Sequence, residues 1–422
     1  MPMSDSFRSS LLPILPAIVR HFGSPGHIYY GPGIRETGKQ IIRAFGHAPG
    51  GYRQFFAVKA CPNPQVLRIM LELGFGFDCS SIAELRLVRS IGAKPIDIMF
   101  TANNTGPLEY AEALAYGGCI LNLDDISFIP DVPEMPELIC FRWNQGPERL
   151  GNSIIGNPVD QKYGVPTQHI IETYRQAIHR GAKRFGLHVM ACSNCLEDNY
   201  FVETVRGLLA IAKRLKQELG IELEFINMGG GVGIPYRPED KPVDLNWVGN
   251  QISDVFREFH QAQGYAPKLL TEFGRLFAPN GVLLLTVINI MQKYKKFVGV
   301  DAACTATMMR PAVYYPNGGY HDIVVYNADG RPQELVNVVG PVCENCDQFA
   351  RDRLLPQLYR GDRLLVQDTL AHCNAMASNY NGHLKPQELM LDNDSVRRIR
   401  EAQTYDDYIS GLDCDPCLLE TV

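Results

Sequence analysis

Short runs of branched and aromatic residues alternate with segments of helical period over the first two thirds of the chain. In the helical segments, such as His169–His179, Phe201–Glu218 and Val248–Gln261, apolar residues recur every three to four positions. Eight strand–helix units over roughly 250 residues predict a (β/α)8 barrel of the TIM type. The eight predicted strands are Gln54–Val58, Phe75–Asp78, Asp97–Thr101, Cys119–Leu123, Leu138–Arg142, Arg184–Val189, Leu223–Met228 and Lys268–Thr271.

From Val287 onward, short β-branched runs follow one another and are separated by Gly, Asn and Pro. This pattern predicts a C-terminal antiparallel β-domain, with a short helix and a loose tail from about Asp394. We therefore expect a barrel over residues 30–285 and a second domain built from residues 1–29 plus 286–422. The predicted strands of this domain are Val287–Ile290, Phe297–Val300, Asp322–Tyr326, Glu334–Val339 and Arg363–Gln367.

Composition narrows the classes of protein and partner. The chain has 422 residues, 45% of them hydrophobic and 20% charged, which is typical of a soluble globular protein. A net charge of -6 argues against nucleic acid or an anionic membrane as partner. Two prolines interrupt the apolar patch Leu11–Val19, which lacks a basic leader, and no apolar run approaches membrane-spanning length. We expect a cytoplasmic protein.

The chain contains 12 cysteines, which in a cytoplasmic protein are expected to be reduced thiols. Three pairs have C-x-x-C spacing, so a structural zinc site is an alternative to consider. The pairs do not follow the usual finger spacing, and we expect no metal. The three pairs are Cys192/Cys195, Cys343/Cys346 and Cys414/Cys417.

Residues capable of chemistry follow the predicted strands. In a barrel of this type the active site lies at the carboxyl ends of the strands, so these side chains should meet at one mouth. They are Lys59, Asp78, Arg142, His188, Glu272 and the glycines Gly229, Gly230, Gly231 and Gly233.

Lys59 follows the first strand and precedes a predicted helix. Asn63 is a suitable N-cap, Pro64 a suitable first helical residue, and Gly74 a suitable C-terminal stop. A lysine at the end of a buried strand is partly desolvated, which is expected to lower its pKa and supply a nucleophilic amine. An imine-forming lysine needs such an amine.

The glycine cluster after the seventh strand predicts a phosphate site, because glycine lets backbone N–H groups approach a phosphate closely. Together with Lys59, the cluster indicates pyridoxal 5'-phosphate, whose aldehyde binds lysine and whose ring nitrogen needs a carboxylate partner. Glu272 is suitably placed, and Arg275 offers forked hydrogen bonds to a carboxylate or phosphate. Asp78 is expected to order the site near Lys59, and Ser81 with Glu84 predicts a capping box.

Several motifs in order resemble the group IV (fold type III) pyridoxal-phosphate decarboxylases, most of all the diaminopimelate decarboxylases. The resemblance covers the chain from about Tyr29 to Gly382 and implies an alanine-racemase-like barrel with a β-domain. The motifs are Phe56-Ala-Val-Lys59-Ala, Asp78-Cys-Ser-Ser, Asn227-Met-Gly-Gly-Gly, Glu272-Phe-Gly-Arg275, Met309-Arg-Pro311 with Tyr314, Gly340-Pro-Val-Cys-Glu344 with Asp347, and Ser378-Asn-Tyr-Asn381.

The resemblance also implies roles for individual residues. Lys59 would hold the cofactor aldehyde, Glu272 would pair with the ring nitrogen, and Cys343, contributed by the partner subunit of a homodimer with shared active sites, would be the general acid. Residues expected to bind the phosphate are Ser193, Gly229, Gly230 and Gly231, with the backbone of the Glu272–Arg275 loop including Gly274. Residues expected to bind the distal end of an amino-acid substrate are Arg275, Arg310, Tyr314 and Glu344.

Five positions depart from the family pattern, one of them Leu370, which stands where a glycine is usual. Met190 stands where a histidine usually stacks on the cofactor ring, and His372 stands where a tyrosine usually touches the phosphate, so His372 is expected to replace it as a donor. Phe273 replaces a proline, and Asn345 replaces a small hydroxyl residue. His188, two residues before Met190, has the alternative interpretation of a core histidine.

The main prediction is therefore decarboxylation of meso-2,6-diaminopimelate to L-lysine. The alternatives are a decarboxylase for another polar or carboxylated diamino acid in a specialised pathway, an enzyme of the alanine-racemase type, and a catalytically silent paralogue that binds the cofactor. Cys343 with Glu344, and Arg310 with Tyr314, argue against the racemase.

Overall fold

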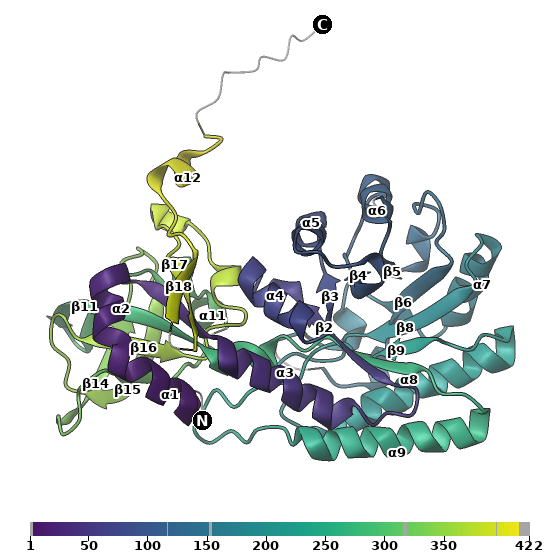
Figure 1. Ribbon diagram of the computed structural model, residues 1–422, viewed down its shortest axis with the longest axis horizontal. Coiled ribbons are helices and arrows are strands. Elements are labelled where there is room, and N and C mark those ends of the chain that lie inside the picture. Colours follow the sequence, from purple (N-terminus) through teal and green to yellow (C-terminus); the bar gives the residue numbers. More distant parts are fainter. Residues whose placement is uncertain (1–2, 116, 152–153, 315–318, 394, 413–422) are drawn as a thin grey trace, which may run out of the picture. The chain divides into compact units, whose positions relative to one another are not determined.

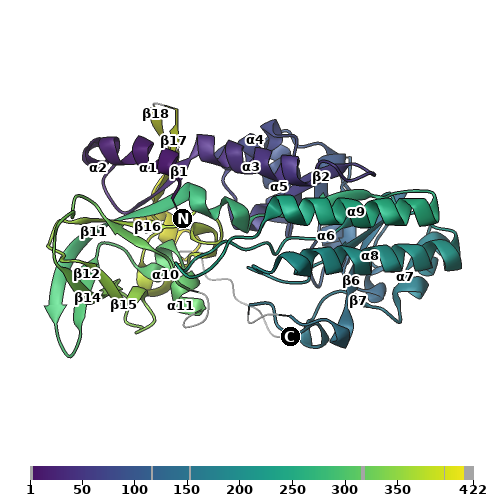
Figure 2. The ribbon, with the colours of Figure 1, turned by 90° about the horizontal axis from the view of Figure 1, so that it is seen from below.

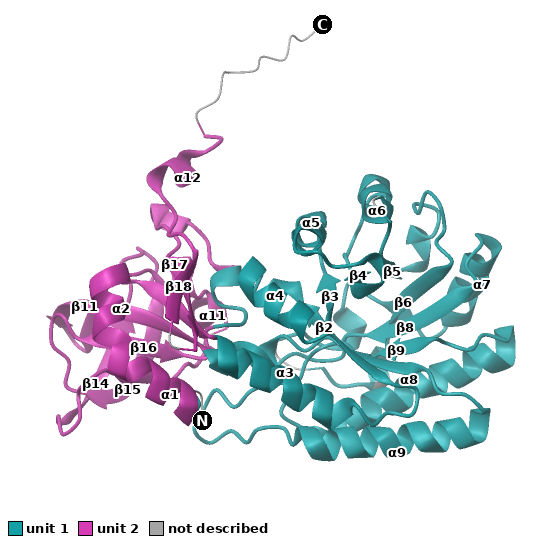
Figure 3. Cartoon of the chain, viewed as in Figure 1, with its two compact units in different colours: residues 1–4, 31–280, 370–375 teal, residues 5–30, 281–369, 376–422 magenta. Residues whose placement is uncertain are grey.

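The computed structural model describes residues 3–115, 117–151, 154–314, 319–393 and 395–412. Two compact units divide the chain (Figure 3). Unit 1 comprises Met1–Ser4, Gly31–Asn280 and Leu370–Ala375, and unit 2 comprises Asp5–Tyr30, Gly281–Thr369 and Met376–Val422. Within the described residues, no helix is both long and apolar enough to cross a membrane.

Unit 1 is a closed barrel of eight parallel strands, as predicted. The strand order is β5-β4-β3-β2-β10-β9-β8-β6, and pairing of β5 with β6 closes the ring. A two-residue strand, β7 (Val165–Pro166), adds to β6. The barrel strands are β2 (Tyr52–Ala57), β3 (Gly76–Cys79), β4 (Ile98–Phe100), β5 (Ile120–Leu123), β6 (Leu138–Asn144), β8 (Arg184–Val189), β9 (Phe225–Asn227) and β10 (Lys268–Thr271).

Helices cover the outside of the barrel (Figure 1), and Figure 2 shows α8 and α9 running side by side along it. The sequence sets their ends: Asn63 accepts a hydrogen bond from the backbone N–H of Gln65 at the start of α4, and Gly220 ends α8 in the left-handed conformation. The helices are α3 (Gly31–Phe45), α4 (Pro64–Glu72), α5 (Ile82–Ser90), α6 (Pro107–Leu114), α7 (Ile170–His179), α8 (Asp198–Leu219) and α9 (Leu245–Gln263).

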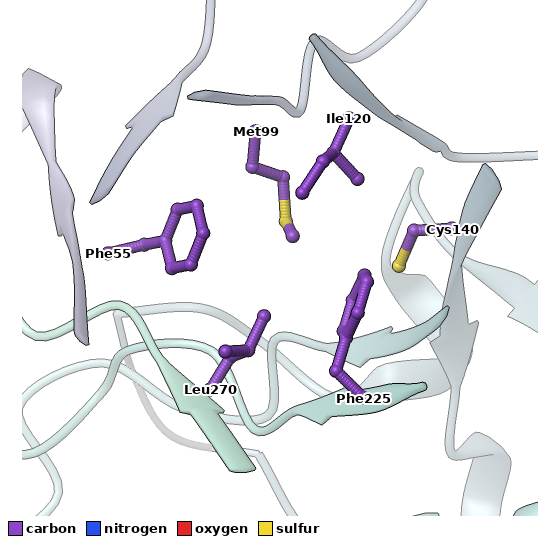
Figure 4. Packing of buried hydrophobic residues seen from close by; sticks show 6 residues of the cluster. All are labelled: Phe55, Met99, Ile120, Cys140, Phe225 and Leu270. Atoms are coloured by element: carbon purple, nitrogen blue, oxygen red, sulfur yellow. The ribbon is translucent and has the colours of Figure 1, made fainter. Parts of the chain in front are cut away.

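The barrel interior is filled by side chains from six of its strands (Figure 4). Gly186 on β8 makes room for the Phe225 ring, because a Cβ at Gly186 would lie 2.1 Å from a ring carbon. Burial of an aromatic ring of this size contributes about 2–3 kcal/mol. The six residues are Phe55, Met99, Ile120, Cys140, Phe225 and Leu270.

Unit 2 contains a nine-stranded sheet that is mixed, so the prediction of an antiparallel domain is wrong in this respect. β1 pairs with β17 in parallel, and β12 pairs with β14 in parallel, while the other pairs are antiparallel. The parallel pair β1–β17 joins segments from opposite ends of the chain, which local patterns cannot reveal. The strands are β1 (Gly26–Tyr30), β11 (Gly281–Gln292), β12 (Lys296–Val300), β13 (Ile323–Val325), β14 (Gln333–Val339), β15 (Gln348–Pro356), β16 (Arg363–Gln367), β17 (Gln387–Asp392) and β18 (Ser395–Arg400).

The segment after Asp394 contains a strand that was not predicted, and the expected loose tail beyond residue 412 lies outside the described residues. Its first residues form the strand β18, which pairs with β17, and the predicted short helix follows as α12. Four of the six residues Ser395–Arg400 are charged or polar, which obscured the strand. The helices of unit 2 are α1 (Asp5–Leu11), α2 (Leu15–Phe22), α10 (Cys304–Thr307), α11 (Arg310–Val313) and α12 (Tyr405–Ile409).

Candidate active site

Lys59 leaves the carboxyl end of β2 in a short 3-10 turn, Val58–Ala60. Its Nζ donates a hydrogen bond to Oδ2 of Asp78 at 2.9 Å. Asp78 lies on the neighbouring strand β3 and is fully buried, whereas 46% of the Lys59 side chain is exposed. The carboxylate therefore orients an amine that remains accessible from the barrel mouth.

The expected lowering of the Lys59 pKa is wrong for this free amine. Burial favours the neutral amine, but the carboxylates of Asp78 and Glu272 outweigh it, so the pKa of Lys59 is raised. The sequence placed Lys59 at a strand end but could not show that two anions converge on it.

Glu272 follows β10 and accepts two hydrogen bonds in the barrel mouth. Its Oε2 lies 3.2 Å from Nε2 of His188, and its Oε1 accepts from Nδ2 of Asn227 at 2.7 Å. Burial acts to raise the pKa of Glu272, but His188, Lys59 and Arg142 more than offset it and lower the pKa to about 2. Glu272 is thus held as a buried carboxylate, and His188 belongs to the site as well as to the core.

Asp124 extends this network beyond the residues that the sequence singled out. It follows β5 and lies 3.3 Å from Nε of Arg142, and both side chains are less than a tenth exposed. Burial raises the pKa of Asp124, while Arg142 and His188 act to lower it. Around the mouth, the pair Arg142–Asp124 therefore adjoins the pair His188–Glu272, and Glu272 in turn acts on Lys59 beside Asp78.

The glycine loop after β9 makes close backbone contacts that a side chain would prevent. A Cβ at Gly229 (φ +69) would lie 2.2 Å from the Val189 oxygen, and one at Gly231 (φ +101) would lie 2.6 Å from the Cys192 oxygen. A Cβ at Gly230 would lie 2.9 Å from the Glu272 oxygen. The loop is therefore a tightly packed backbone surface at the barrel mouth.

Ser193 and Arg275 lie together beside this loop. Nη2 of Arg275 donates to Oγ of Ser193 at 3.2 Å, and Nη1 donates to the hydroxyl of Tyr236 at 3.0 Å. Gly274, the residue before Arg275, packs on the Lys59 turn, because a Cβ there would lie 2.7 Å from Cβ of Ala60. The structure thus brings the predicted phosphate ligands to one side of the mouth.

Two of the departures from the family pattern also lie near this mouth. The backbone of Met190 is beside the glycine loop, with its Cα 3.5 Å from the position of a Cβ on Gly229. His372 adopts a left-handed backbone (φ +58) and donates its N–H to the Ala60 oxygen at 2.8 Å. Phe273 is buried in contact with Phe45, with ring centroids 5.5 Å apart.

The predicted capping box of α5 is only half formed. Ser81 Oγ accepts from the Glu84 N–H at 3.3 Å, but the Glu84 carboxylate accepts from the N–H of Ser80 at 2.7 Å rather than from that of Ser81. The role of Glu84 is therefore structural. Its carboxylate binds the N–H one residue before the one that a capping box would use.

Four predicted residues lie in unit 2. Cys343 and Glu344 are exposed, and the hydroxyl of Tyr380 lies 3.2 Å from Oε1 of Glu344. Arg310 is fully buried, its Nε donates to Nε2 of His321 at 3.3 Å, and its guanidinium lies 5.7 Å from the Tyr314 ring centroid. Arg310 and Tyr314 are thus neighbours, as are Cys343 and Glu344.

Two of the C-x-x-C pairs consist of free thiols. Cys192/Cys195 lies in the loop after β8, and Cys343/Cys346 lies in the loop between β14 and β15. The third pair, Cys414/Cys417, lies outside the described residues. Sequence reasoning gave no role to Asp124, Asn227, Tyr236 or Tyr380. Both Asn227 and Tyr380 lie within the family motifs, and Asn227 ends a strand two residues before Gly229, a position that indicates the barrel mouth.

The residues of unit 1 fit pyridoxal phosphate. An accessible amine, a buried carboxylate to pair with a protonated ring nitrogen, and a backbone cradle that a Cβ would fill are the features that this cofactor needs. Nδ1 of His188 and Oδ1 of Asp78 are buried and have no hydrogen-bond partner among the described residues, so polar groups remain available at the mouth.

Comparison with known proteins agrees with this assignment. Residues 34–279 match the family model of the pyridoxal-dependent decarboxylases, pyridoxal binding domain. Protein TabA of Pseudomonas amygdali pv. tabaci is 41% identical over 418 residues, covering 99% of this chain and 97% of the relative. Diaminopimelate decarboxylase of Methanothermobacter thermautotrophicus is 35% identical over 407 residues, covering 94% of each chain.

Among solved structures, diaminopimelate decarboxylase from M. jannaschii in complex with L-lysine superposes with a TM-score of 0.87 at 27% identity, covering 95% of this chain and 94% of that one. The match in sequence covers more than half of the chain, and the match in fold covers both units. The chain therefore belongs to the pyridoxal-phosphate-dependent decarboxylases of the alanine-racemase-like fold, carboxy-lyases with pyridoxal 5'-phosphate as cofactor.

Proposed function

We propose that this protein decarboxylates meso-2,6-diaminopimelate to L-lysine and carbon dioxide, in lysine biosynthesis. The observation that carries the proposal is that Glu344 stands beside Cys343 on one exposed loop, while Arg310 adjoins Tyr314. A distal end carrying both an ammonium and a carboxylate needs partners of both charges, and a substrate lacking either group leaves a partner unsatisfied. The named decarboxylases among the relatives support the same substrate.

In unit 1, residues of the barrel mouth hold and orient the cofactor. Lys59 supplies the amine that binds its aldehyde, and Asp78 directs that amine. Glu272 keeps the ring nitrogen protonated, because its own low pKa leaves it an anion at neutral pH. When bound, pyridoxal phosphate stabilises the negative charge that remains on the substrate α-carbon as carbon dioxide leaves.

The phosphate lies, in this proposal, in the cradle of Gly229, Gly230 and Gly231. Ser193 donates its hydroxyl, and Arg275, which already donates to Ser193, adds positive charge. His372 would donate to the phosphate in place of the usual tyrosine, and Met190 would offer its thioether to the cofactor ring. His188 acts through Glu272.

Cys343 returns a proton to the α-carbon after decarboxylation. Cys343 is exposed on unit 2, so we propose that a partner subunit covers it and that a homodimer shares its active sites. Arg275, Arg310 and Tyr314 then bind the distal carboxylate, and Glu344 binds the distal ammonium.

The second candidate is a decarboxylase for another diamino acid in a specialised pathway. Met190, His372 and Asn345 depart from the family pattern around the cofactor and substrate, and the 41% identical relative, protein TabA, has a name that states no substrate. A catalytically silent paralogue is a third alternative, against which the presence of Lys59, Glu272 and Cys343 argues.

The deciding experiment measures carbon dioxide and lysine released from meso-2,6-diaminopimelate by the purified protein with added pyridoxal phosphate. Lys59→Ala should abolish the absorption band of the bound cofactor, and Cys343→Ala should keep the band but lose turnover. If the absorption band of the bound cofactor forms but no carbon dioxide is released, the result favours the second candidate, a decarboxylase for another diamino acid. A band with no release from any diamino acid would support the silent paralogue.

Shared sites are tested separately by mixing the two inactive variants. If Lys59 and Cys343 act in different subunits, random dimers of Lys59→Ala and Cys343→Ala should recover about a quarter of the wild-type activity per site. Recovery of no activity, with subunit exchange shown by mass, would place both residues in the same subunit.

A further inference from the structure

The hydroxyl of Tyr380 lies between the thiol of Cys343 and the carboxylate of Glu344. It is 3.2 Å from Oε1 of Glu344 and 3.9 Å from Sγ of Cys343. All three residues belong to unit 2 and are exposed on it. The pair that we assign to proton donation and to substrate recognition is thus joined by one phenol.

The backbone holds this arrangement in place. The N–H of Cys343 donates to Oδ1 of Asn381 at 3.0 Å, and Asn381 adopts the left-handed conformation (φ +55) that asparagine tolerates. Asn379, on the other side of Tyr380, donates its Nδ2 to the His383 oxygen at 2.9 Å. The Cys343–Asn381 bond therefore joins two loops next to the phenol, and the Asn379–His383 bond stabilises the loop that carries Tyr380.

A tyrosine hydroxyl has a single proton to donate. While Cys343 is a thiol, the hydroxyl donates to Glu344 and can accept from S–H. Once Cys343 has given its proton to the substrate α-carbon, the hydroxyl can turn to the thiolate, where a charge-assisted bond is about twice as strong as a neutral one. The hydrogen bond and negative charge of Cys343, followed by the charge of Glu344, raise the pKa of Tyr380, so the phenol keeps its proton at neutral pH.

We propose that Tyr380 is a positioning residue for the proton-return step, which holds the Cys343 thiol toward the substrate and stabilises the thiolate left behind. The step balances: the S–H bond breaks, a C–H bond forms at the α-carbon, and the sulfur keeps the electron pair until it regains a proton from water. Tyr380 donates a hydrogen bond and transfers no proton. This inference rests on the role of Cys343 in the proposed function.

Substrate binding is coupled to the same hydroxyl. A distal ammonium that binds Glu344 competes with Tyr380 for that carboxylate and so frees the phenol to turn toward sulfur. A substrate without a distal ammonium leaves the Tyr380 hydroxyl hydrogen-bonded to Glu344. The Cys343 thiolate is then less stabilised.

The test compares the full-length holoenzyme with Tyr380→Phe and with the control Tyr405→Phe, whose ring is 68% exposed in the same unit. The rate of alkylation of Cys343 by iodoacetamide, followed by mass spectrometry of its peptide, is measured against pH. Tyr380→Phe should raise the midpoint by about one pH unit, since a charge-assisted donor to the thiolate is lost. Tyr405→Phe should leave it in place.

A second measurement is the pH profile of kcat with the loaded enzyme. Tyr380→Phe should lower kcat about tenfold, change KM less than about threefold, and move the basic limb in the same direction as the alkylation midpoint. If neither the midpoint nor the limb moves, the inference is wrong. Because alkylation does not require turnover, a shifted midpoint in a protein inactive on every amino acid would uphold the link of Tyr380 to Cys343 while rejecting the proposed function.

Discussion

Nε2 of His188 lies 3.2 Å from Oε2 of Glu272, and both side chains are almost completely buried at the mouth of the barrel. The pair explains how a carboxylate can stay ionised inside a protein. Burial alone would protonate Glu272, and the positive charge nearby reverses that preference. In the proposed site, the carboxylate that would pair with the cofactor ring is therefore kept ionised by its neighbours, His188 among them.

Replacing His188 by glutamine should weaken cofactor binding. The amide keeps a hydrogen bond but removes the imidazole that lowers the pKa of Glu272, so this pKa rises and pairing with a protonated ring nitrogen becomes weaker. We expect the Kd for pyridoxal phosphate to rise about tenfold, measured by absorbance titration at pH 7. His179→Gln, an exposed position on α7, is the matched control. Equal affinities in the two variants would show that His188 is only a core residue.

Stability toward acid should depend on Glu272. Its pKa is about 2 in the folded chain against 4.5 in the unfolded chain. The unfolded state therefore binds more protons between these values, so the contribution is full above about pH 4.5 and is lost as pH falls toward 2. That contribution is on the order of 3 kcal/mol.

The measurement is the free energy of unfolding in urea at pH 6, 5, 4 and 3 for the apoprotein. Glu272→Gln should show a shallower loss of stability toward acid than wild type. Glu239→Gln, at an exposed loop position, should follow the wild-type curve. Parallel curves for wild type and Glu272→Gln would mean that the carboxylate has an ordinary pKa in the folded chain.

Gly229→Ala should damage the phosphate cradle specifically. Its Cβ would lie 2.2 Å from the Val189 oxygen, so the loop must move. Gly220 is the matched control, since it has a similar φ of +71 but no atom within 4 Å of a Cβ. We expect Gly220→Ala to cost about 1 kcal/mol of stability with cofactor affinity retained, and Gly229→Ala to lower that affinity at least about tenfold. Similar affinities in both variants would exclude the glycine loop as the phosphate site.

Met190→His should tighten the cofactor or raise turnover. Histidine restores the aromatic ring that the family usually places over the cofactor, and Met190 follows β8 beside the glycine loop. Cofactor Kd and kcat are measured together, with Met190→Leu as a control for size. No change in either quantity would indicate that Met190 does not face the cofactor.

Local patterns in the sequence carried much of the architecture. The strand Lys268–Thr271 begins and ends where the pattern predicts, as does Arg184–Val189, because in each an exposed basic residue precedes a buried and mainly apolar stretch. The position of Lys59 followed from the same pattern, since a barrel gathers strand ends at one mouth. Lys59 and the glycine cluster indicated the cofactor, and the resemblance to a known family, carried by short motifs, supported it.

Tertiary structure decided what depends on distance between remote residues. The sequence could not show that Asp78 and Glu272 both act on Lys59, so the predicted direction of its pKa shift was wrong. It also missed the parallel pairing of β1 with β17, which joins residues more than 350 positions apart. The sequence determined the hydrophobic periodicity, the helix caps and the strand ends, because each depends on residues that are close together along the chain. Electrostatic shifts, sheet pairing across the chain and the position of Tyr380 beside Cys343 arise only when folding brings distant side chains within a few ångströms.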